Sequence, residues 1–188
     1  MQQSRRGFFG KVSRIGAALL ATGAVVGSTA EAKKSGTVAV LSESQAEQLF
    51  YIYQEEKVAR DVYSTLGELY PDESTFALIQ LSEQSHIEAM AGLCDTYGID
   101  ISYVNLDAIG QFELPVLQQL YDTCVAQGSL SLVDGLRVGE LIELTDLDDL
   151  ASAEIGMPSD VVKVLENLKA GSENHLDAFR RAIARAEA

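Results

Sequence analysis

The chain has 188 residues, of which 28 are acidic and 14 are basic, so its formal net charge is −14. A surface this acidic repels nucleic acid and anionic membranes, which excludes both as expected partners and favours the attraction of cations. The length suits one folded domain behind a short N-terminal leader.

Residues 1–32 are predicted to be a twin-arginine signal peptide. The pair Arg5-Arg6 lies within residues 4–11, an apolar stretch covers residues 15–26, and residues 30–32 offer a small-x-small cleavage site. Cleavage would leave Lys33 first and place the protein in the periplasm or outside the cell, with no stable membrane anchor. An uncleaved anchor is the alternative. Removal of the leader takes away four basic residues and one acidic residue. The remaining chain has 10 basic and 27 acidic residues and a formal net charge of −17.

Taken in chain order, the remaining residues predict an all-α fold. Residues 33–44 are expected to form a flexible lead-in, followed by one domain over 45–188. Periodicity and helix-breaking residues predict helices over about 45–70, 74–97, 115–126, 131–153 and 160–188. The expected N-caps are Ser42 or Ser44, Ser74 and Ser159. Residues 99–113 are predicted to be a long crossover loop.

The second of these helices carries the clearest candidate site. Apolar and aromatic residues recur along it at alternating steps of three and four, as Phe76, Ile79, Glu83, His86, Met90, Leu93 and Tyr97. Only Glu83 and His86 interrupt this seam with polar groups. A charge at a core position is costly unless it is neutralised. Glu-x-x-His on one helical face therefore predicts two metal ligands about one turn apart.

The other long helices carry polar residues at matching places. In the first, Glu56 is the one charged residue on a seam that also contains Tyr63. In the last, His175 follows Ser172 on an otherwise apolar seam. The helix over 131–153 is less regular, because Leu141, Leu144 and Leu147 define a face that competes with the one carrying Glu143 and Asp146.

Each of these residues has an ordinary structural explanation when taken alone. A glutamate on a seam often packs its stem and keeps its head in water, and a core histidine is more often hydrogen-bonded than a metal ligand. Four helices that each contribute favour the metal interpretation. A bundle that carries Glu on two helices and Glu-x-x-His on two others binds two iron or manganese ions, and zinc could substitute.

The two cysteines allow two interpretations. Cys94 lies near the end of the second predicted helix and Cys124 near the end of the short one. An exported protein could bridge them if the crossover folded back on the bundle. Two free, buried thiols are the alternative.

These residues resemble a known family. The segment 56–63 is similar to the first helix of the ferritin-like superfamily, Glu-x-x-Ala-x-x-x-Tyr, as in rubrerythrins, and residues 83–86 match its second helix. More closely, residues 45–180 resemble the family named domain of unknown function 2202, through segments 55–63, 83–86, 109–112, 120–121, 127–129, 142–146 and 171–176. The resemblance implies a ferritin-like four-helix bundle with a dinuclear metal centre and a long crossover between helices two and three that contains a short extra helix.

One position departs from the superfamily pattern. The fourth helix of the superfamily usually carries Glu-x-x-His, but here the first position is Ser172. Glu173 is rotated about 100° off the seam. Either Asp146 substitutes for the missing carboxylate, or one metal subsite is weak or empty.

The resulting expectation is an exported di-metal oxidoreductase of ferroxidase or peroxidase type, with oxygen or peroxide as the reactant. Glu56 and His86 would hold one ion, Glu143 and His175 the other, and Glu83 would bridge them. Tyr63 is either a hydrogen-bond donor or redox relay beside the centre, or core packing. The alternatives are a metal-storage module without turnover and a structural bundle with a decayed site. A homodimer is compatible with the sequence.

Overall fold

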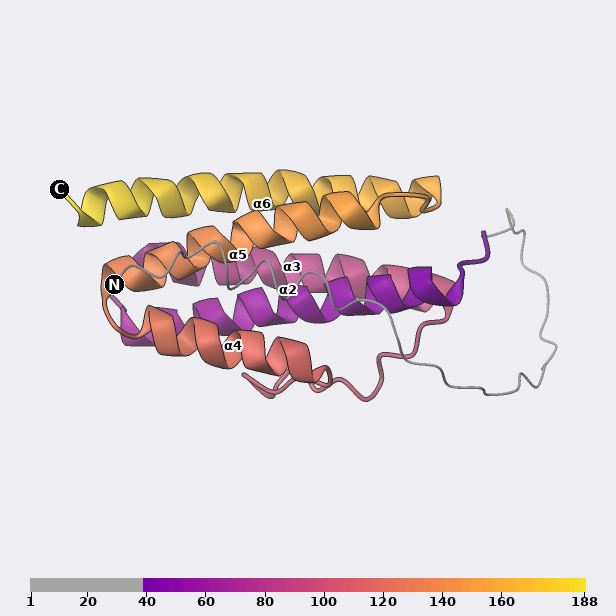
Figure 1. Ribbon diagram of the computed structural model, residues 1–188, viewed down its shortest axis with the longest axis horizontal. Helices are drawn as coiled ribbons and strands as arrows, with labels where there is room; N and C mark the ends of the chain where they lie inside the picture. Colours follow the sequence, from indigo (N-terminus) through magenta and orange to yellow (C-terminus); the bar gives the residue numbers. More distant parts are fainter. Residues whose placement is uncertain (1–38) are drawn as a thin grey trace, which may run out of the picture. The chain divides into compact units, whose positions relative to one another are not determined.

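The computed structural model describes residues 39–188 and confirms an all-helical bundle. It has five helices in this part of the chain and no strand: α2 (Glu43–Leu69), α3 (Ser74–Tyr97), α4 (Pro115–Gly128), α5 (Leu132–Ala153) and α6 (Ser159–Ala186) (Figure 1). The predicted signal peptide and its cleavage site lie outside the described residues. Within the described part, no helix is both long and apolar enough to cross a membrane.

The helix ends follow from local chemistry. Ser42 caps α2 in a capping box with Gln45, so α2 begins inside the segment predicted to be a flexible lead-in. Pro115 opens α4 in its first turn. The N-caps of α3 and α6 are Glu73 and Pro158 rather than the predicted Ser74 and Ser159. These serines instead occupy the first helical positions, and the Glu73 carboxylate accepts the backbone N–H of Thr75 at 3.0 Å.

Four long helices pack in a ring, in which α2 contacts α3 and α5, and α6 contacts the same two helices. The shorter α4 lies against α2 and α5 (Figure 1). The chain leaves the ring after α3, passes through residues 98–114 and α4, and returns as α5. The structure thus contains the crossover with a short extra helix that the sequence predicted.

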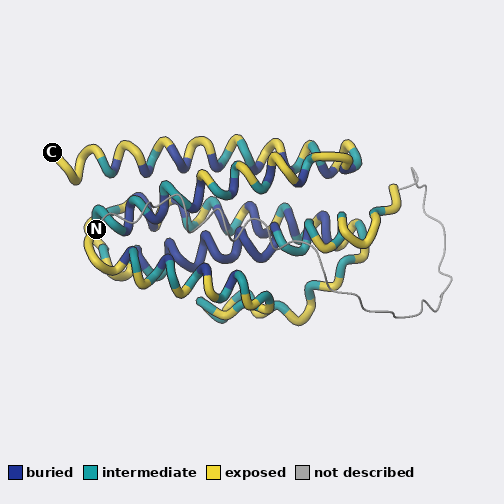
Figure 2. The backbone as a smooth tube through the Cα atoms, viewed as in Figure 1, coloured by how far each residue is buried: buried dark blue, intermediate teal, exposed yellow. Residues whose placement is uncertain are grey.

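Helix α2 is the centre of the molecule. Every residue from Ile52 to Tyr63 is buried, including the charged ones (Figure 2). A helix that is covered by α3, α4, α5 and a loop has no solvent-facing side along this stretch. Its charged residues must therefore find partners inside the protein.

The polar residues on one side of α2 hold the crossover loop. Lys57 Nζ lies 2.6 Å from the Asp61 carboxylate and donates to the carbonyl oxygen of Ala108 at 2.9 Å. Arg60 pairs with Asp61 at 2.7 Å and donates to the carbonyl oxygen of Leu106 at 2.7 Å. These bonds satisfy carbonyl groups of the loop and fix the path of the crossover.

Apolar residues fill the ring at both ends and leave a polar layer between them. One end contains Leu49, Ile52, Met90, Leu150 and Leu165 among other buried residues. At the other end the rings of Tyr63 and Phe179 lie 5.1 Å apart, and those of Phe76 and Phe179 lie 5.8 Å apart. The layer between these ends is where all four long helices place buried polar side chains.

The two cysteines are not bridged, so the disulfide hypothesis is wrong for this structure. Cys94 and Cys124 are free and buried. Their helices explain why, because α3 packs against α2 and α6 whereas α4 packs against α2 and α5. Burial raises the pKa of Cys94 to about 11 and that of Cys124 to about 12, which keeps both thiols protonated and unreactive near neutral pH.

Candidate metal centre

The polar layer contains all six residues predicted to bind metal. We use "polar layer" for Glu56 of α2, Glu83 and His86 of α3, Glu143 and Asp146 of α5, and Ser172 and His175 of α6; every one of them is buried. The predicted off-seam residue Glu173 is exposed. The α5 ambiguity is resolved in favour of the face carrying Glu143 and Asp146, because Leu144 on the competing face is 39 % exposed.

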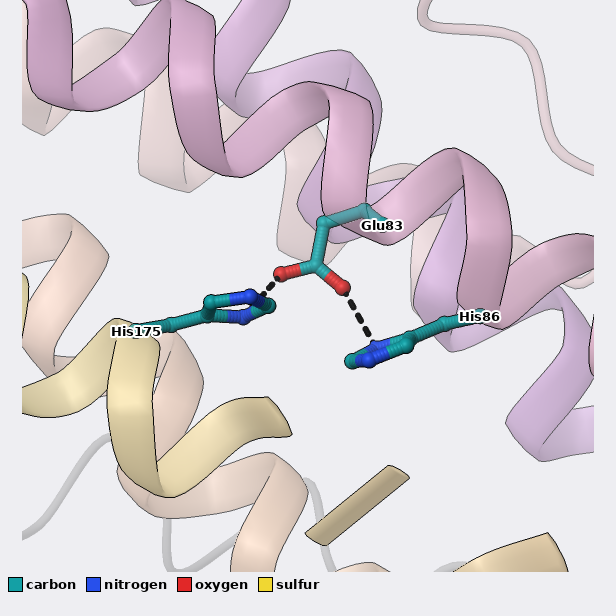
Figure 3. A group of neighbouring side chains, drawn as sticks. All are labelled: Glu83, His86 and His175. Carbon is teal, nitrogen blue, oxygen red and sulfur yellow. Dashed lines mark ion pairs between the residues drawn. The ribbon is translucent and has the colours of Figure 1, made fainter. Parts of the chain in front are cut away.

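Glu83 lies between the two imidazoles (Figure 3). Its Oε2 atom is 2.8 Å from Nδ1 of His86, and its Oε1 atom is 2.9 Å from Nδ1 of His175. The imidazole rings lie 5.4 Å apart, centroid to centroid. Glu83, His86 and His175 thus bring three ligand atoms within 4.8 Å of one another, a grouping that could hold a metal ion.

A second carboxylate stands beside each imidazole. Glu56 Oε2 is 3.2 Å from Nδ1 of His86, and Glu143 Oε2 is 3.5 Å from Nδ1 of His175. The Tyr63 hydroxyl donates a 2.6 Å hydrogen bond to Glu143 Oε1. Tyr63 therefore both packs in the aromatic core and orients a carboxylate of the layer.

Asp146 and Ser172 meet across the α5–α6 contact. The Ser172 hydroxyl donates to Asp146 Oδ2 at 2.6 Å, and both residues are buried. The small serine leaves space that the aspartate of the neighbouring helix occupies. Asp146 thus brings a carboxylate next to position 172, where the superfamily pattern has glutamate and this chain has serine.

Several ligand atoms of the layer have no hydrogen-bond partner although they are buried. They are Glu56 Oε1, Glu83 Oε1, Asp146 Oδ1 and His175 Nδ1. The last of these lies 2.9 Å from Glu83 Oε1 without the alignment that a hydrogen bond requires. Glu83 Oε1 and His175 Nδ1 form an ion pair with each other, which leaves Glu56 Oε1 and Asp146 Oδ1. Buried polar atoms are nearly always paired, so these two atoms fit a common partner such as a cation.

The charge balance of the polar layer also fits bound cations. Its four carboxylates outnumber its two imidazoles, and the buried basic residues of α2 pair with Asp61 and the crossover loop instead. When all four carboxylates are ionised, two negative charges stay uncompensated even if both imidazoles are protonated, so without a cation the layer must take up further protons. Two divalent cations would balance four carboxylates with both imidazoles neutral, so the residues present fit a dinuclear centre.

Proton affinities in the layer are strongly shifted. Burial opposes ionisation of Glu83, but His175 and His86 outweigh it and lower its pKa to about 2. Burial also opposes protonation of the imidazoles, yet neighbouring glutamates raise the pKa of His86 to about 11 and that of His175 to about 9. Burial raises the pKa of Glu143 to about 8, and the negative charge of Glu83 adds to this effect.

Sequence reasoning missed a further buried carboxylate, Glu55, which is 5 % exposed. It directly precedes Glu56, so the helical period places it about 100° away from the seam. It is buried because α5 covers that side of α2, and burial together with Asp149 of α5 raises its pKa well above the usual range. No sequence signal other than its position in a charge-rich stretch distinguishes it from a solvent-exposed residue.

The chain is similar to known proteins over most of its length. The model of an uncharacterized protein domain, DUF2202, matches residues 45–187. The uncharacterized protein MJ0754 of Methanocaldococcus jannaschii is 40% identical over 144 residues, which cover 76% of this chain and 77% of that protein. The crystal structure of the hypothetical protein MJ0754 has a TM-score of 0.77 and 37% identity, with 82% of this chain and 88% of that chain covered.

Proposed function

This chain belongs to the DUF2202 family, and we propose that it is a ferritin-like metalloprotein that holds two iron or manganese ions for redox chemistry with oxygen or peroxide. The observation that carries the proposal is the polar layer, where Glu83 contacts both imidazoles and buried ligand atoms lack partners. A mixed imidazole and carboxylate ligand set suits iron and manganese, with zinc as a substitute.

The proposed ligand assignment follows the two halves of the layer. Glu56 and His86 would hold one ion, Glu143 and His175 the other, and Glu83 would bridge them. Asp146 would supply the carboxylate that Ser172 lacks. This gives four carboxylates and two histidines, the inventory of the di-iron and di-manganese carboxylate bundles.

The chain's own residues would prepare this centre for its reaction. A bound metal pair would supply redox equivalents and an open coordination position for oxygen or peroxide. Tyr63 holds its proton at Glu143 Oε1, which fixes the orientation of that carboxylate. The same side chain would serve as the redox relay, and its support for that role is its contact with both Glu143 and the ring of Phe179. The apolar ends of the ring exclude bulk water from the layer.

Metal analysis of the full chain, purified from its native compartment, tests the proposal. We expect close to two iron or manganese ions per chain. Glu83→Ala should remove most of the metal, because this residue would serve both ions, whereas Glu173→Gln should keep it. A chain without metal would favour a structural bundle with a decayed site. A metal-loaded chain that does not react with peroxide or oxygen would favour a storage module.

Export belongs to the same proposal. The twin-arginine route carries folded proteins, which fits a metal centre assembled before translocation. Mass spectrometry of the exported protein should find an N-terminus at or near Lys33. A chain that keeps Met1 in the cytoplasm would contradict export without affecting the metal assignment.

A further inference from the structure

One group of carboxylates lies outside the proposed ligand set. Glu55 of α2 faces Asp149 of α5, and the two carboxyl groups lie within hydrogen-bonding reach of each other. Glu55 is 5 % exposed, and its Oε2 atom is buried without a hydrogen-bond partner. Two facing carboxylates with an unpartnered buried oxygen need either a shared proton or a cation between them.

The carboxylates near Glu55 differ in burial, from the exposed surface of α5 to the polar layer. Asp149 is half-buried and follows Asp148, which is exposed. One turn earlier on the same face of α5 stands Asp146, whose Oδ1 atom is also buried without a partner. The charges that act most strongly on Glu55 come from Asp149, Asp146 and Glu56. A line of carboxylates therefore leads inward from the surface to the proposed centre.

The basic residues of α2 do not neutralise this line. Lys57 and Arg60 pair with Asp61 and with crossover-loop carbonyls on another side of the helix. Tyr51, half-buried on the turn before Glu55, hydrogen-bonds Glu55 through its neutral hydroxyl and lies near Asp149, but it brings no positive charge. The neighbourhood of Glu55 thus offers oxygen atoms and negative charge, the ligand chemistry of a divalent cation that keeps part of its water shell.

We infer that Glu55 and Asp149 form an accessory site for a divalent cation, through which ions pass from solvent to Asp146 and the dinuclear centre. The inference rests on the proposed function, because that centre is the destination of the ion. It assigns Glu55 and Asp149 a role in delivery, separate from the ligands that retain the metal. A concentration of one sign of charge on a protein raises the association rate of an opposite charge by about 10- to 1,000-fold.

The experiment follows the loading of metal-free full chain with Co²⁺ in a stopped-flow spectrometer, together with the number of ions bound at equilibrium. Glu55→Gln and Asp149→Asn remove one charge each and keep the side-chain volume. Glu47→Gln is the matched control, since it removes the same charge from an exposed position two turns earlier on α2. We expect each test variant to load roughly tenfold more slowly or worse, with two ions still bound at equilibrium.

Each other outcome is decisive. Test variants that load as fast as the unmodified chain, or a control that slows equally, would overturn the delivery site and leave the proposed function standing. Loss of a bound ion at equilibrium in Glu55→Gln would show a ligand instead of a transit residue. An unmodified chain that binds no Co²⁺ would refute the metal centre itself. Asp149→Asn, at a half-exposed position, keeps the test valid if Glu55→Gln fails to fold.

Discussion

At the scale of single residues, the pair Asp146 and Ser172 shows how a buried carboxylate can come from one helix or from its neighbour. The two side chains share a 2.6 Å hydrogen bond, and Asp146 keeps its other oxygen free of partners. A serine that donates to one carboxylate oxygen leaves the other available and fixes its direction. This geometry favours Asp146 as a ligand over an empty subsite.

Replacement of Asp146 by asparagine tests this assignment. We expect Asp146→Asn to reduce the bound metal from about two ions to about one, because the amide keeps the volume but lacks the charge. Ser172→Ala should weaken binding less, since it removes only the orienting donor. Metal analysis after equilibrium dialysis measures both. Two tightly bound ions in Asp146→Asn would show that the aspartate is only a structural partner of Ser172.

At the scale of helices, the sequence predicts the polar layer because the helical period assigns each residue to a face of its helix. A polar residue that interrupts an apolar face can therefore be recognised. Glu56, Glu83, His86 and His175 could be found in this way. The burial of Glu55, Lys57 and Asp61 could not, because it depends on α5 and on the crossover loop rather than on the period of α2. A central helix covered on all sides has no polar face, so its charged residues look like solvent-exposed ones in the sequence.

The approach of α6 to α3 provides a second prediction. A Cβ atom added to Gly171 would stand 2.5 Å from Nε2 of His86. We expect Gly171→Ala to displace this imidazole and lower the affinity for metal, although alanine favours the helix. Gly92→Ala is the control, since a Cβ atom there meets nothing within 4 Å. That variant should keep its metal and gain up to about 1 kcal/mol of stability in urea unfolding. Unchanged metal binding in Gly171→Ala would contradict the expected clash.

The attachment of the crossover loop to α2 gives a third prediction. Asp61→Asn leaves the buried Lys57 ammonium without its carboxylate, which should reduce the free energy of unfolding by roughly 3–5 kcal/mol. Glu140→Gln removes the partner of the exposed Arg180 and should cost less than about 1 kcal/mol. Urea unfolding followed by circular dichroism compares the two. Equal, small losses would mean that the loop is held by other contacts.

At the scale of the whole molecule, the proposed metal centre implies a balance between protons and metal ions in the polar layer. Metal binding requires deprotonated carboxylates and neutral imidazoles, so protons compete with the metal for the same atoms. The metal-free protein has to hold protons in their place. His86 and His175 then act as the counter-ions of the glutamates, which is why their pKa values rise.

This balance predicts how the metal-free protein responds to pH. The folded chain binds more protons than the unfolded chain wherever a folded pKa is raised: burial raises the pKa of Glu56 to about 7 and that of Glu143 to about 8, and carboxylate neighbours raise that of His175 to about 9. By linkage, stability must fall as pH rises. The loss begins above the unfolded carboxyl pKa of 4.5 and continues past the unfolded histidine pKa of 6.5. The lowered pKa of Glu83 acts in the opposite direction, but only below pH 4.5.

We therefore expect the unfolding free energy of metal-free protein to decrease by several kcal/mol between pH 5 and pH 9. The difference in stability between metal-loaded and metal-free protein should grow over the same range, because deprotonated ligands bind metal more tightly. Urea titrations at fixed ionic strength, with and without Mn²⁺, measure both trends. Metal-free protein that is equally stable at both ends of this range would show that the layer does not store protons in the absence of metal, and the charge argument for a dinuclear centre would fail with it.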